Sequence, residues 1–263
     1  MTMTTTDAPL LLGRDGAVAT IRFNRPAALN AIDVPMANAF LAAARELAAD
    51  RSVRAVLMSG AGKGFMAGGD LGVLSADPQQ GAADLIDPLH EAMTVLDRMD
   101  APLVAQVHGV AAGAGLSMML QADFVLAAEG TRFNLAYVNI GTSCDVGASW
   151  ALPRLVGLRR ALEIAMLGDT YDAAAAERMG LVNRVVPVAE LEAEAMALAQ
   201  RLAKGPTVAL GNLRRLMRGS LGRDLPAQLD AESAAFQDCA ATDDFRIGLD
   251  AFFARKPAAF TGR

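Results

Sequence analysis

Apolar residues follow two different spacings along the first two thirds of the chain. Continuous apolar runs at residues 53–60 and 101–110 are typical of buried strands, and each leads into a glycine-rich loop. Residues 9–24 place two β-forming runs on either side of residues 14–16, which predicts a hairpin with its turn there.

Helical spacing follows the strand-like runs. Asp33 stands where an N-cap is expected for a helix that runs to about Ala49. The inner face of another helix is marked by Ile86, Leu89, Met93 and Leu96. The repeated order of strand, loop and helix predicts an α/β fold whose ligands meet the loops after the strands.

The pattern changes to helices alone after residue 187. Helical segments are expected from about residue 188 and at 207–219, 225–238 and 243–256. We therefore predict a core at residues 1–205 that carries the site, and a C-terminal helical region at 206–263. This region has more apolar positions than a surface appendage should expose, which predicts a subunit interface. These positions are Leu213, Leu216, Leu225, Leu229, Phe236, Phe245, Leu249 and Phe252.

Composition narrows the class of protein. A chain of 263 residues that is 53% hydrophobic can bury one large core. The net charge of −5, with no basic stripe, argues against nucleic acid as a partner. Apolar runs are too short for a membrane span, and the N-terminal residues lack a secretory signal. We expect a cytoplasmic protein that holds any phosphate-bearing ligand locally.

Several common chemical motifs are missing. Residues 113–118 lack the third glycine of a dinucleotide fingerprint, and residues 57–64 have Leu57 and Gly64 where a P-loop needs glycine and a hydroxyl residue. There is no G-x-S-x-G sequence for a serine nucleophile. His90 and His108 have no metal ligands at suitable spacing, so we expect no metal.

Two glycine-rich loops suggest a site for a carbonyl oxygen. They lie at residues 63–71 and 108–119, and the second runs into a helix whose N-terminus exposes free N–H donors. The N–H groups of Gly69 and Ala114 together would form an oxyanion hole. Close packing of strand against helix would also explain the glycines of either loop taken alone.

Asp145 is the acid that stands out in this part of the chain. Residues 139–150 surround it with glycines and small side chains. It would cap the helix that follows, or it would act as a base or nucleophile at the rim of a pocket.

These segments together resemble the crotonase superfamily, which contains the enoyl-CoA hydratases and isomerases. The resemblance covers nearly the whole chain, at residues 24–32, 65–71, 104–133, 168–187 and 252–260. It implies a spiral of ββα units, a C-terminal helical region that builds trimers or dimers of trimers, and a coenzyme A thioester as substrate. It also assigns the oxyanion hole to Gly69 and Ala114.

The resemblance further implies residues that bind coenzyme A. Arg25, Ala27 and Leu29 would meet its nucleotide and pantetheine portions, and Lys256, from the same or a neighbouring subunit, would approach its phosphates. Lys256 would equally suit an ordinary solvated surface position. Ala67, Gly68 and Asp70, beside Gly69, complete the expected binding loop. No cofactor is expected, because coenzyme A is part of the substrate.

Departures from the family decide the chemistry we expect. Hydratases have one glutamate at the position of Ser117 and another at that of Tyr137, because adding water to a double bond needs a base and an acid. Both are missing here, so hydration by the paired mechanism is not expected. Ser117 and Tyr137 would line the pocket or donate hydrogen bonds.

Asp145 resembles the aspartate that shuttles a proton in dienoyl-CoA isomerases and in the phenylacetate-pathway isomerase. It also matches the nucleophile of chlorobenzoyl-CoA dehalogenase, whose catalytic histidine corresponds to His90 and whose tryptophan is Tyr137 here. We favour double-bond isomerisation, because one carboxylate beside a polarised thioester suffices for it and His90 has no part in it. A dehalogenase, a hydratase with another mechanism and a non-catalytic acyl-CoA-binding protein remain alternatives.

The acyl group is expected to be hydrophobic or aromatic, because the residues expected to shape its pocket are apolar. They are Met66, Leu74, Leu85, Leu89, Tyr137 and Trp150.

Overall fold

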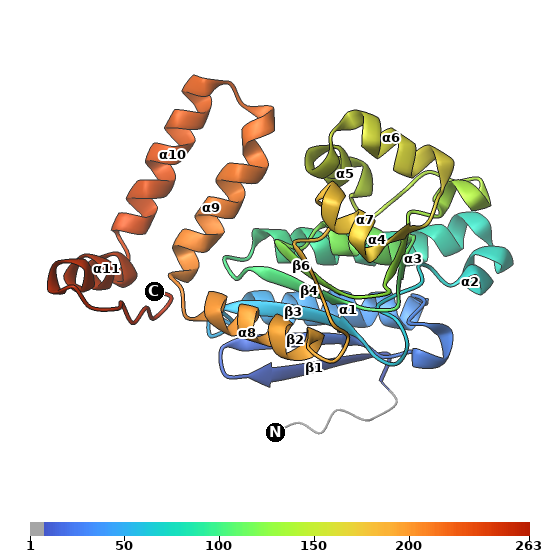
Figure 1. Ribbon diagram of the computed structural model, residues 1–263, viewed down its shortest axis with the longest axis horizontal. Helices are drawn as coiled ribbons and strands as arrows, with labels where there is room; N and C mark the ends of the chain where they lie inside the picture. Colours follow the sequence, from blue (N-terminus) through green and yellow to red (C-terminus); the bar gives the residue numbers. More distant parts are fainter. Residues whose placement is uncertain (1–7) are drawn as a thin grey trace.

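A six-stranded sheet forms the central layer of the protein in the computed structural model, which describes residues 8–263 (Figure 1). The strand order is β1-β2-β3-β4-β6-β9; β1 and β2 are antiparallel, and the other neighbours are parallel. The strands are β1 (Leu10–Asp15), β2 (Val18–Phe23), β3 (Ala55–Gly60), β4 (Leu103–Val107), β6 (Phe124–Ala128) and β9 (Arg184–Val186). Residues 1–7, which carry part of the expectation about a secretory signal, lie outside the described residues.

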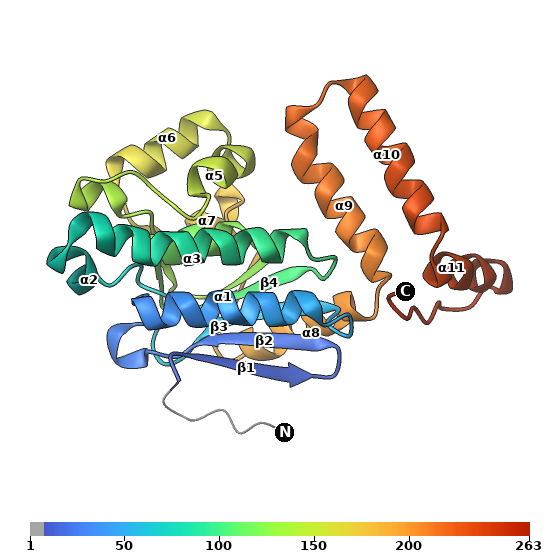
Figure 2. The same ribbon diagram turned by 180° about the vertical axis from the view of Figure 1, so that it is seen from behind.

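Both faces of the sheet are covered, and alternate residues of each strand supply the two cores. On β3, Val56 and Met58 join the larger core, which includes buried residues of α1 (Val34–Ala49) and α3 (Pro78–Arg98). Their neighbours Ala55 and Leu57 face the smaller core with α8 (Leu191–Ala203). Figure 1 shows α8 on one face of the sheet, and Figure 2 shows α1 and α3 on the other.

The two helices expected in the first hundred residues are confirmed as α1 and α3. Asp33 accepts a hydrogen bond from the Met36 N–H, at 2.9 Å, and caps α1. The predicted hairpin turn, at residues 14–16, begins two residues too early. Arg14 and Asp15 still pair with β2, so the turn lies at Gly16 and Ala17.

A second, smaller sheet and a set of short helices build the side of the molecule that holds the site. This sheet has the order β5-β7-β8, with β5 (Val110–Ala112), β7 (Arg132–Asn134) and β8 (Tyr171–Asp172). The short helices are α2 (Leu71–Ala76), α4 (Ala114–Leu120), α5 (Ala148–Val156), α6 (Leu158–Leu167) and α7 (Ala173–Met179), with the 3-10 turns η1 (Pro26–Ala28) and η2 (Tyr137–Ile140).

The last helices form an arm, residues 207–263, that extends to one side of the sheet (Figures 1 and 2). It contains α9 (Thr207–Gly219), η3 (Ser220–Gly222), α10 (Leu225–Ala240) and α11 (Asp243–Ala254). Its exposed large apolar residues are Leu213, Met217, Leu221, Leu225, Leu229, Phe236, Leu249, Phe252 and Phe253. Within residues 8–263, no helix combines the length and the apolar character needed to cross a membrane.

Buried charges join the arm to the core. The carboxylate of Asp123, in the turn before β6, forms ion pairs with two guanidinium groups of α9, those of Arg214 at 3.0 Å and Arg218 at 2.9 Å. Only 7% of the Arg214 side chain and 13% of the Asp123 side chain are exposed. Arg214 also donates to the backbone carbonyls of Met99 and Ala101. α9 therefore has a defined orientation on the core.

Candidate active site

A cavity of about 680 Å³ opens between α2 and α3 on one side and residues 136–145 on the other. Its floor is made by the two glycine-rich loops, and most of its wall is apolar. The apolar wall includes Leu71, Leu74, Leu85, Ile86, Leu89 and Ile140; the polar side chains are Ser75, His90, Tyr137, Thr142, Ser143 and Asp145. Half-buried Cys144 lines it as well.

The two loops come into direct contact at Gly68 and Gly113. Gly68 has φ +105°, and a Cβ there would lie 3.3 Å from the Ala112 carbonyl oxygen. Gly113 has φ +50°, and a Cβ there would lie 3.5 Å from the Gly68 Cα. Glycine is required at both positions because left-handed backbone disfavours a side chain and the facing backbone leaves little room.

The loops leave two backbone donors free at the cavity. Ala114 is the first residue of α4, so its N–H has no partner within the helix. Throughout residues 8–263, no group accepts a hydrogen bond from the N–H of Gly69 or of Ala114. A Cβ built on Gly69 would first meet Leu85 Cδ1, at 3.7 Å, so the space beside it opens toward the acyl wall. Two free donors over an apolar cavity suit a polarised carbonyl oxygen.

Asp145 does not cap the helix that follows it. The N-cap of α5 is Gly147, which has no side-chain capping bond. The Asp145 carboxylate instead accepts a hydrogen bond from the Tyr137 hydroxyl. Ser117 Oγ lies 3.0 Å from that hydroxyl. Because Tyr137 gives its one proton to Asp145, it can only accept from Ser117, whose single hydroxyl proton also has the Gly113 carbonyl within reach, at 3.3 Å.

The surroundings of Asp145 raise the pKa of its carboxyl group above the ordinary value. Burial is the main cause, and it outweighs the hydrogen bond from Tyr137, which lowers the pKa. The pKa of Tyr137 is also raised, first by burial and then by the charge of Asp145. Tyr137 therefore remains a protonated donor, and Asp145 is the group that can accept a proton from a ligand.

His90, on α3, faces the segment that carries Asp145. The Val146 N–H donates to its Nε2 at 3.0 Å. A backbone N–H can only donate, so Nε2 carries no proton and the neutral ring carries its proton on Nδ1. The sequence placed His90 beside the apolar stripe of its helix, and the structure places it on the wall of the cavity.

Comparison with known proteins identifies the family of this chain. The family model described as enoyl-CoA hydratase/isomerase matches residues 13–263. The chain belongs to this family. Among similar proteins, the 1,2-epoxyphenylacetyl-CoA isomerase of Escherichia coli strain K12 is 34% identical over 253 residues, which cover 94% of this chain and 95% of that protein.

Other members of the enoyl-CoA hydratase/isomerase family have hydratase names. The 2,3-dehydroadipyl-CoA hydratase of Escherichia coli strain K12 is 32% identical over 255 residues and covers 97% of this chain and 99% of its own length. A crystal structure of enoyl-CoA hydratase from Mycobacterium smegmatis has a TM-score of 0.88 at 31% identity and covers 95% of this chain and 98% of its own. The protein is thus an enzyme with the crotonase fold that acts on coenzyme A thioesters.

In this enoyl-CoA hydratase/isomerase, the expected coenzyme A contacts lie at different distances from the cavity. Ala67 and Gly68 line it, and Ala27 and Leu29 are exposed on the loop before α1. Arg25 is held by two carboxylates, Asp33 and Asp70, each at 3.2 Å. The pair of carboxylates neutralises Arg25, and Asp70 also caps α2, so neither residue offers a free charge to a phosphate.

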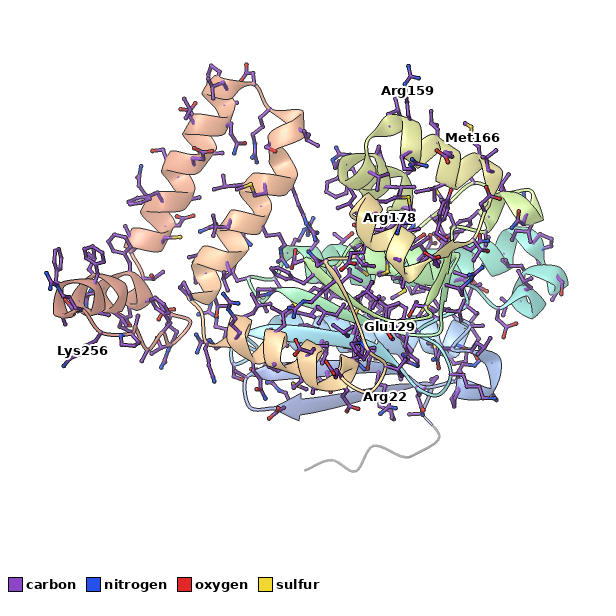
Figure 3. The ribbon with its side chains drawn as sticks, viewed as in Figure 1. Arg22, Glu129, Arg159, Met166, Arg178 and Lys256 are labelled. Carbon is purple, nitrogen blue, oxygen red and sulfur yellow. The ribbon has the colours of Figure 1, made fainter. Side chains whose placement is uncertain are left out.

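Lys256 lies far from the cavity within one chain. Figure 3 shows it at the outer end of the arm, and Figure 1 shows α2 and α3 at the opposite end of the molecule. The expectation that Lys256 meets the phosphates from the same subunit is therefore wrong. A contact from a neighbouring subunit remains a prediction.

Two of the residues expected in the acyl pocket lie elsewhere. Met66 is fully buried beneath α4, where a Cβ on Gly115 would lie 2.4 Å from its carbonyl oxygen. Trp150 is 40% exposed, stacks under the Arg154 guanidinium at 4.3 Å and lines a groove between α5 and α9. Both lie outside the acyl cavity because packing turned them away. Leu74, Leu85 and Leu89 do line it.

Sequence reasoning missed two residues that hold the site in place. Asn30 is fully buried, and its Nδ2 donates to the carbonyls of Ala61, at 2.9 Å, and Gly64, at 2.8 Å, which ties the loop before α1 to the first glycine-rich loop. Val146 is the other; its φ of +48° is unusual for a β-branched residue. Asn30 lies in a segment that carries the family resemblance, residues 24–32, but nothing there indicated its role, and Val146 shows no signal in the local sequence. In the described part of the chain, no cluster of three or more His, Cys, Asp or Glu could hold a metal ion.

Proposed function

We propose that this enzyme moves a double bond along the acyl chain of a hydrophobic enoyl-CoA thioester, with Asp145 as the proton shuttle. One observation carries the proposal. Asp145 is the single carboxylate among the described residues that line the cavity, and it lies in the same cavity as the free N–H groups of Gly69 and Ala114. An isomerase needs one base and one oxyanion site, and hydration by the paired mechanism needs two carboxylates.

The reaction balances with these groups alone. The thioester carbonyl oxygen accepts hydrogen bonds from Gly69 and Ala114, which makes the neighbouring C–H more acidic. Asp145 removes a proton from the α or γ carbon, and the C–H electrons pass into a dienolate whose negative oxygen the two donors stabilise. The protonated Asp145 then returns the proton to the other carbon. The double bond has moved, and no cofactor is consumed.

Tyr137 and Ser117 support the shuttle in this proposal. Tyr137 holds one carboxylate oxygen of Asp145, which leaves the other free to face the acyl chain. The raised pKa of Asp145 brings its affinity for protons closer to what a base needs near neutral pH, because a carboxylate with an ordinary pKa binds protons weakly there.

The state of His90 disfavours the dehalogenase alternative. That reaction needs a histidine with a free nitrogen lone pair to deprotonate water after Asp145 has attacked a ring. The only lone pair on the neutral His90 ring points at the Val146 N–H. His90 would have to break this hydrogen bond to act as a base.

We also infer that the enzyme works as a trimer or a dimer of trimers, in which the arm meets other copies. The supporting observation is that large apolar side chains of the arm are exposed. Phe252 and Phe253 on α11 are 76% and 77% exposed, and Leu225 on α10 is 70% exposed. In such an assembly, a neighbouring subunit's arm would also bring Lys256 to the coenzyme A phosphates.

Proton exchange with solvent tests the proposed reaction. The enzyme is incubated in D₂O with 3-enoyl and 2-enoyl thioesters, and mass spectrometry follows the α and γ positions. Asp145→Asn should lower isomerisation and exchange by at least about 10³-fold while leaving thioester binding intact, because the amide keeps the shape and cannot accept a proton.

Asp84→Asn, on the exposed side of α3, is the matched control and should retain full exchange. Halide release from a halobenzoyl thioester, with no exchange on any enoyl thioester, would overturn the proposal in favour of a dehalogenase. A 3-hydroxyacyl product with no double-bond migration would favour a hydratase, and absence of any turnover would favour a binding protein.

A further inference from the structure

The segment Asp145–Gly147 has a strained backbone. Val146 has φ +48° although its side chain branches at Cβ, and it is only 2% exposed. A β-branched residue adopts this conformation at a cost, and it stays there only when its surroundings hold it. Gly147, with φ +75°, continues the left-handed turn. This turn sends the Val146 side chain into the core and leaves Asp145 on the cavity wall.

Two side chains from different helices hold Val146 at both of its backbone polar groups. His90 Nε2, from α3, accepts the Val146 N–H at 3.0 Å. Gln121, the C-cap of α4, donates its Nε2 to the Val146 carbonyl at 3.3 Å. A Cβ on Gly147 would lie 2.7 Å from the Gln121 Nε2, so the segment fits closely against this amide.

The peptide group that His90 holds is the one that links Asp145 to Val146. A rotation of this peptide would turn the Asp145 Cα, and the carboxylate would swing with it. Tyr137 fixes one carboxylate oxygen, but a single hydrogen bond from η2 leaves the direction of the second oxygen free. His90 therefore holds the peptide group that follows Asp145, and Tyr137 holds its carboxylate.

We propose that His90 is a positioning residue: its unprotonated Nε2 locks the strained Val146 peptide and thereby aims the Asp145 carboxylate at the acyl chain. This inference rests on the proposed isomerase function, and it replaces the expectation that His90 has no part in the reaction. His90 exchanges no proton with substrate. A small error in the position of a catalytic group costs a large factor in rate, so loss of the lock lowers kcat.

Two substitutions at position 90 separate positioning from proton transfer. His90→Leu removes the acceptor and should lower kcat by about 10- to 100-fold with KM changed less than about threefold. His90→Gln places an amide oxygen where Nε2 was, so it should restore kcat to within about threefold of the unmodified enzyme. Glu91→Gln is the control and should match the unmodified enzyme; Glu91 lies on the same helix as His90 and forms an exposed ion pair with Arg45 of α1.

The lock itself can be measured without activity. The chain has 2 histidines, so the nitrogen NMR spectrum of ¹⁵N-histidine-labelled enzyme is simple, and His108→Gln assigns it. His90 should show an unprotonated Nε2 and a protonated Nδ1. Hydrogen exchange should show the Val146 amide protected in the unmodified enzyme and in His90→Gln, and exchanging at least about tenfold faster in His90→Leu.

The outcomes are distinct. A proton on Nε2 of His90, or a Val146 amide that exchanges equally fast in all variants, overturns the inference even if isomerisation is found. Equal loss of kcat in His90→Gln and His90→Leu also overturns it, in favour of proton transfer by His90. If the unmodified enzyme isomerises no thioester but the tautomer and the protection are as expected, the lock stands and the proposed function fails.

Discussion

At the scale of residues, the proposed reaction makes the rate at low pH depend on the pair of Tyr137 and Asp145. Burial raises the pKa of Asp145, and the hydrogen bond from Tyr137 partly offsets this effect because it stabilises the carboxylate. Only the ionised Asp145 can remove a proton. The rate should therefore fall as the pH decreases through the pKa of Asp145, at a higher pH than for an exposed carboxylate.

In a plot of rate against pH, the acid limb is the part where the rate falls as the pH decreases. Tyr137→Phe should move this limb to higher pH. The substitution removes the hydrogen bond that lowers the pKa of Asp145, so the pKa rises further and more enzyme is protonated at any given acidic pH. The measurement is kcat/KM between about pH 4 and 9. Ser117→Ala, which touches Tyr137 and not Asp145, should cause a smaller shift in the same direction. An acid limb that stays in place or moves to lower pH in Tyr137→Phe would contradict the assigned role.

The proposed oxyanion donor at Ala114 can be tested with a substitution that removes only its N–H. Ala114→Pro deletes the N–H at the first position of α4, where proline is well tolerated. We expect kcat to fall by about 10²- to 10³-fold with KM changed only a few-fold, because the donor matters most for the negative oxygen of the dienolate. Ala114→Gly keeps the N–H and should stay close to the unmodified enzyme. Equal losses in both variants would mean that packing and not the donor is responsible.

At the scale of elements, buried charges fix the position of α9 on the core. Asp123→Ala would leave the guanidinium groups of Arg214 and Arg218 without their shared carboxylate. Removing one partner of a buried ion pair costs about 3–5 kcal/mol, so chemical denaturation at fixed protein concentration should show a loss of that size. The exposed pair Arg160–Glu163 provides the control, and Glu163→Ala should cost less than about 1 kcal/mol. Similar losses of unfolding free energy in both variants would show that the ion pairs of Asp123 stabilise the protein no more than an exposed pair does.

At the scale of the whole molecule, the arm exposes large apolar side chains that no other part of the chain covers. α10 has no buried residue within the chain, and Leu225, Leu229 and Phe236 on it are all exposed. Six of the apolar positions predicted to lie at an interface are exposed, and Leu216 and Phe245 are half-buried. Exposed apolar surface of this extent is typical of a site of protein–protein contact.

Light scattering should therefore find three or six times the chain mass of 27.4 kDa at micromolar concentration. A single Phe252→Asp substitution places a charge in the expected interface and should lower the mass or raise the concentration needed for assembly. A stable monomer of the unmodified protein at micromolar concentration would contradict the inferred assembly.

Much of the fold was predictable because its signals are local. The spacing of apolar residues identified β3 and α3, and Asp33 marked the start of α1. The two glycine-rich loops were also recognisable as places where backbone approaches backbone, and Gly68 and Gly113 meet there. Each of these signals acts within a few residues of chain, where covalent geometry alone limits the outcome.

Contacts between distant segments were not predictable. Trp150 was expected in the acyl pocket, and its helix instead turns it toward α9 and Arg154. Arg25 was expected near the nucleotide and pantetheine portions of coenzyme A, and its ion pairs with Asp33 and Asp70, from other segments, could not be foreseen. Helical periodicity shows which residues share a face, but it does not show what that face will meet.

The sequence by itself determined the chemical inventory of the site: Asp145 is present, and Ser117 and Tyr137 stand where the family resemblance places the two glutamates of a hydratase. Only the tertiary structure decided what these groups touch. It brought Tyr137 to the carboxylate and directed the lone pair of His90 to Val146, 56 positions away. A hydrogen bond depends on distance and direction within tenths of an ångström, and packing of separate elements sets both. Residue types limit which reactions are possible, and their packed positions select among them.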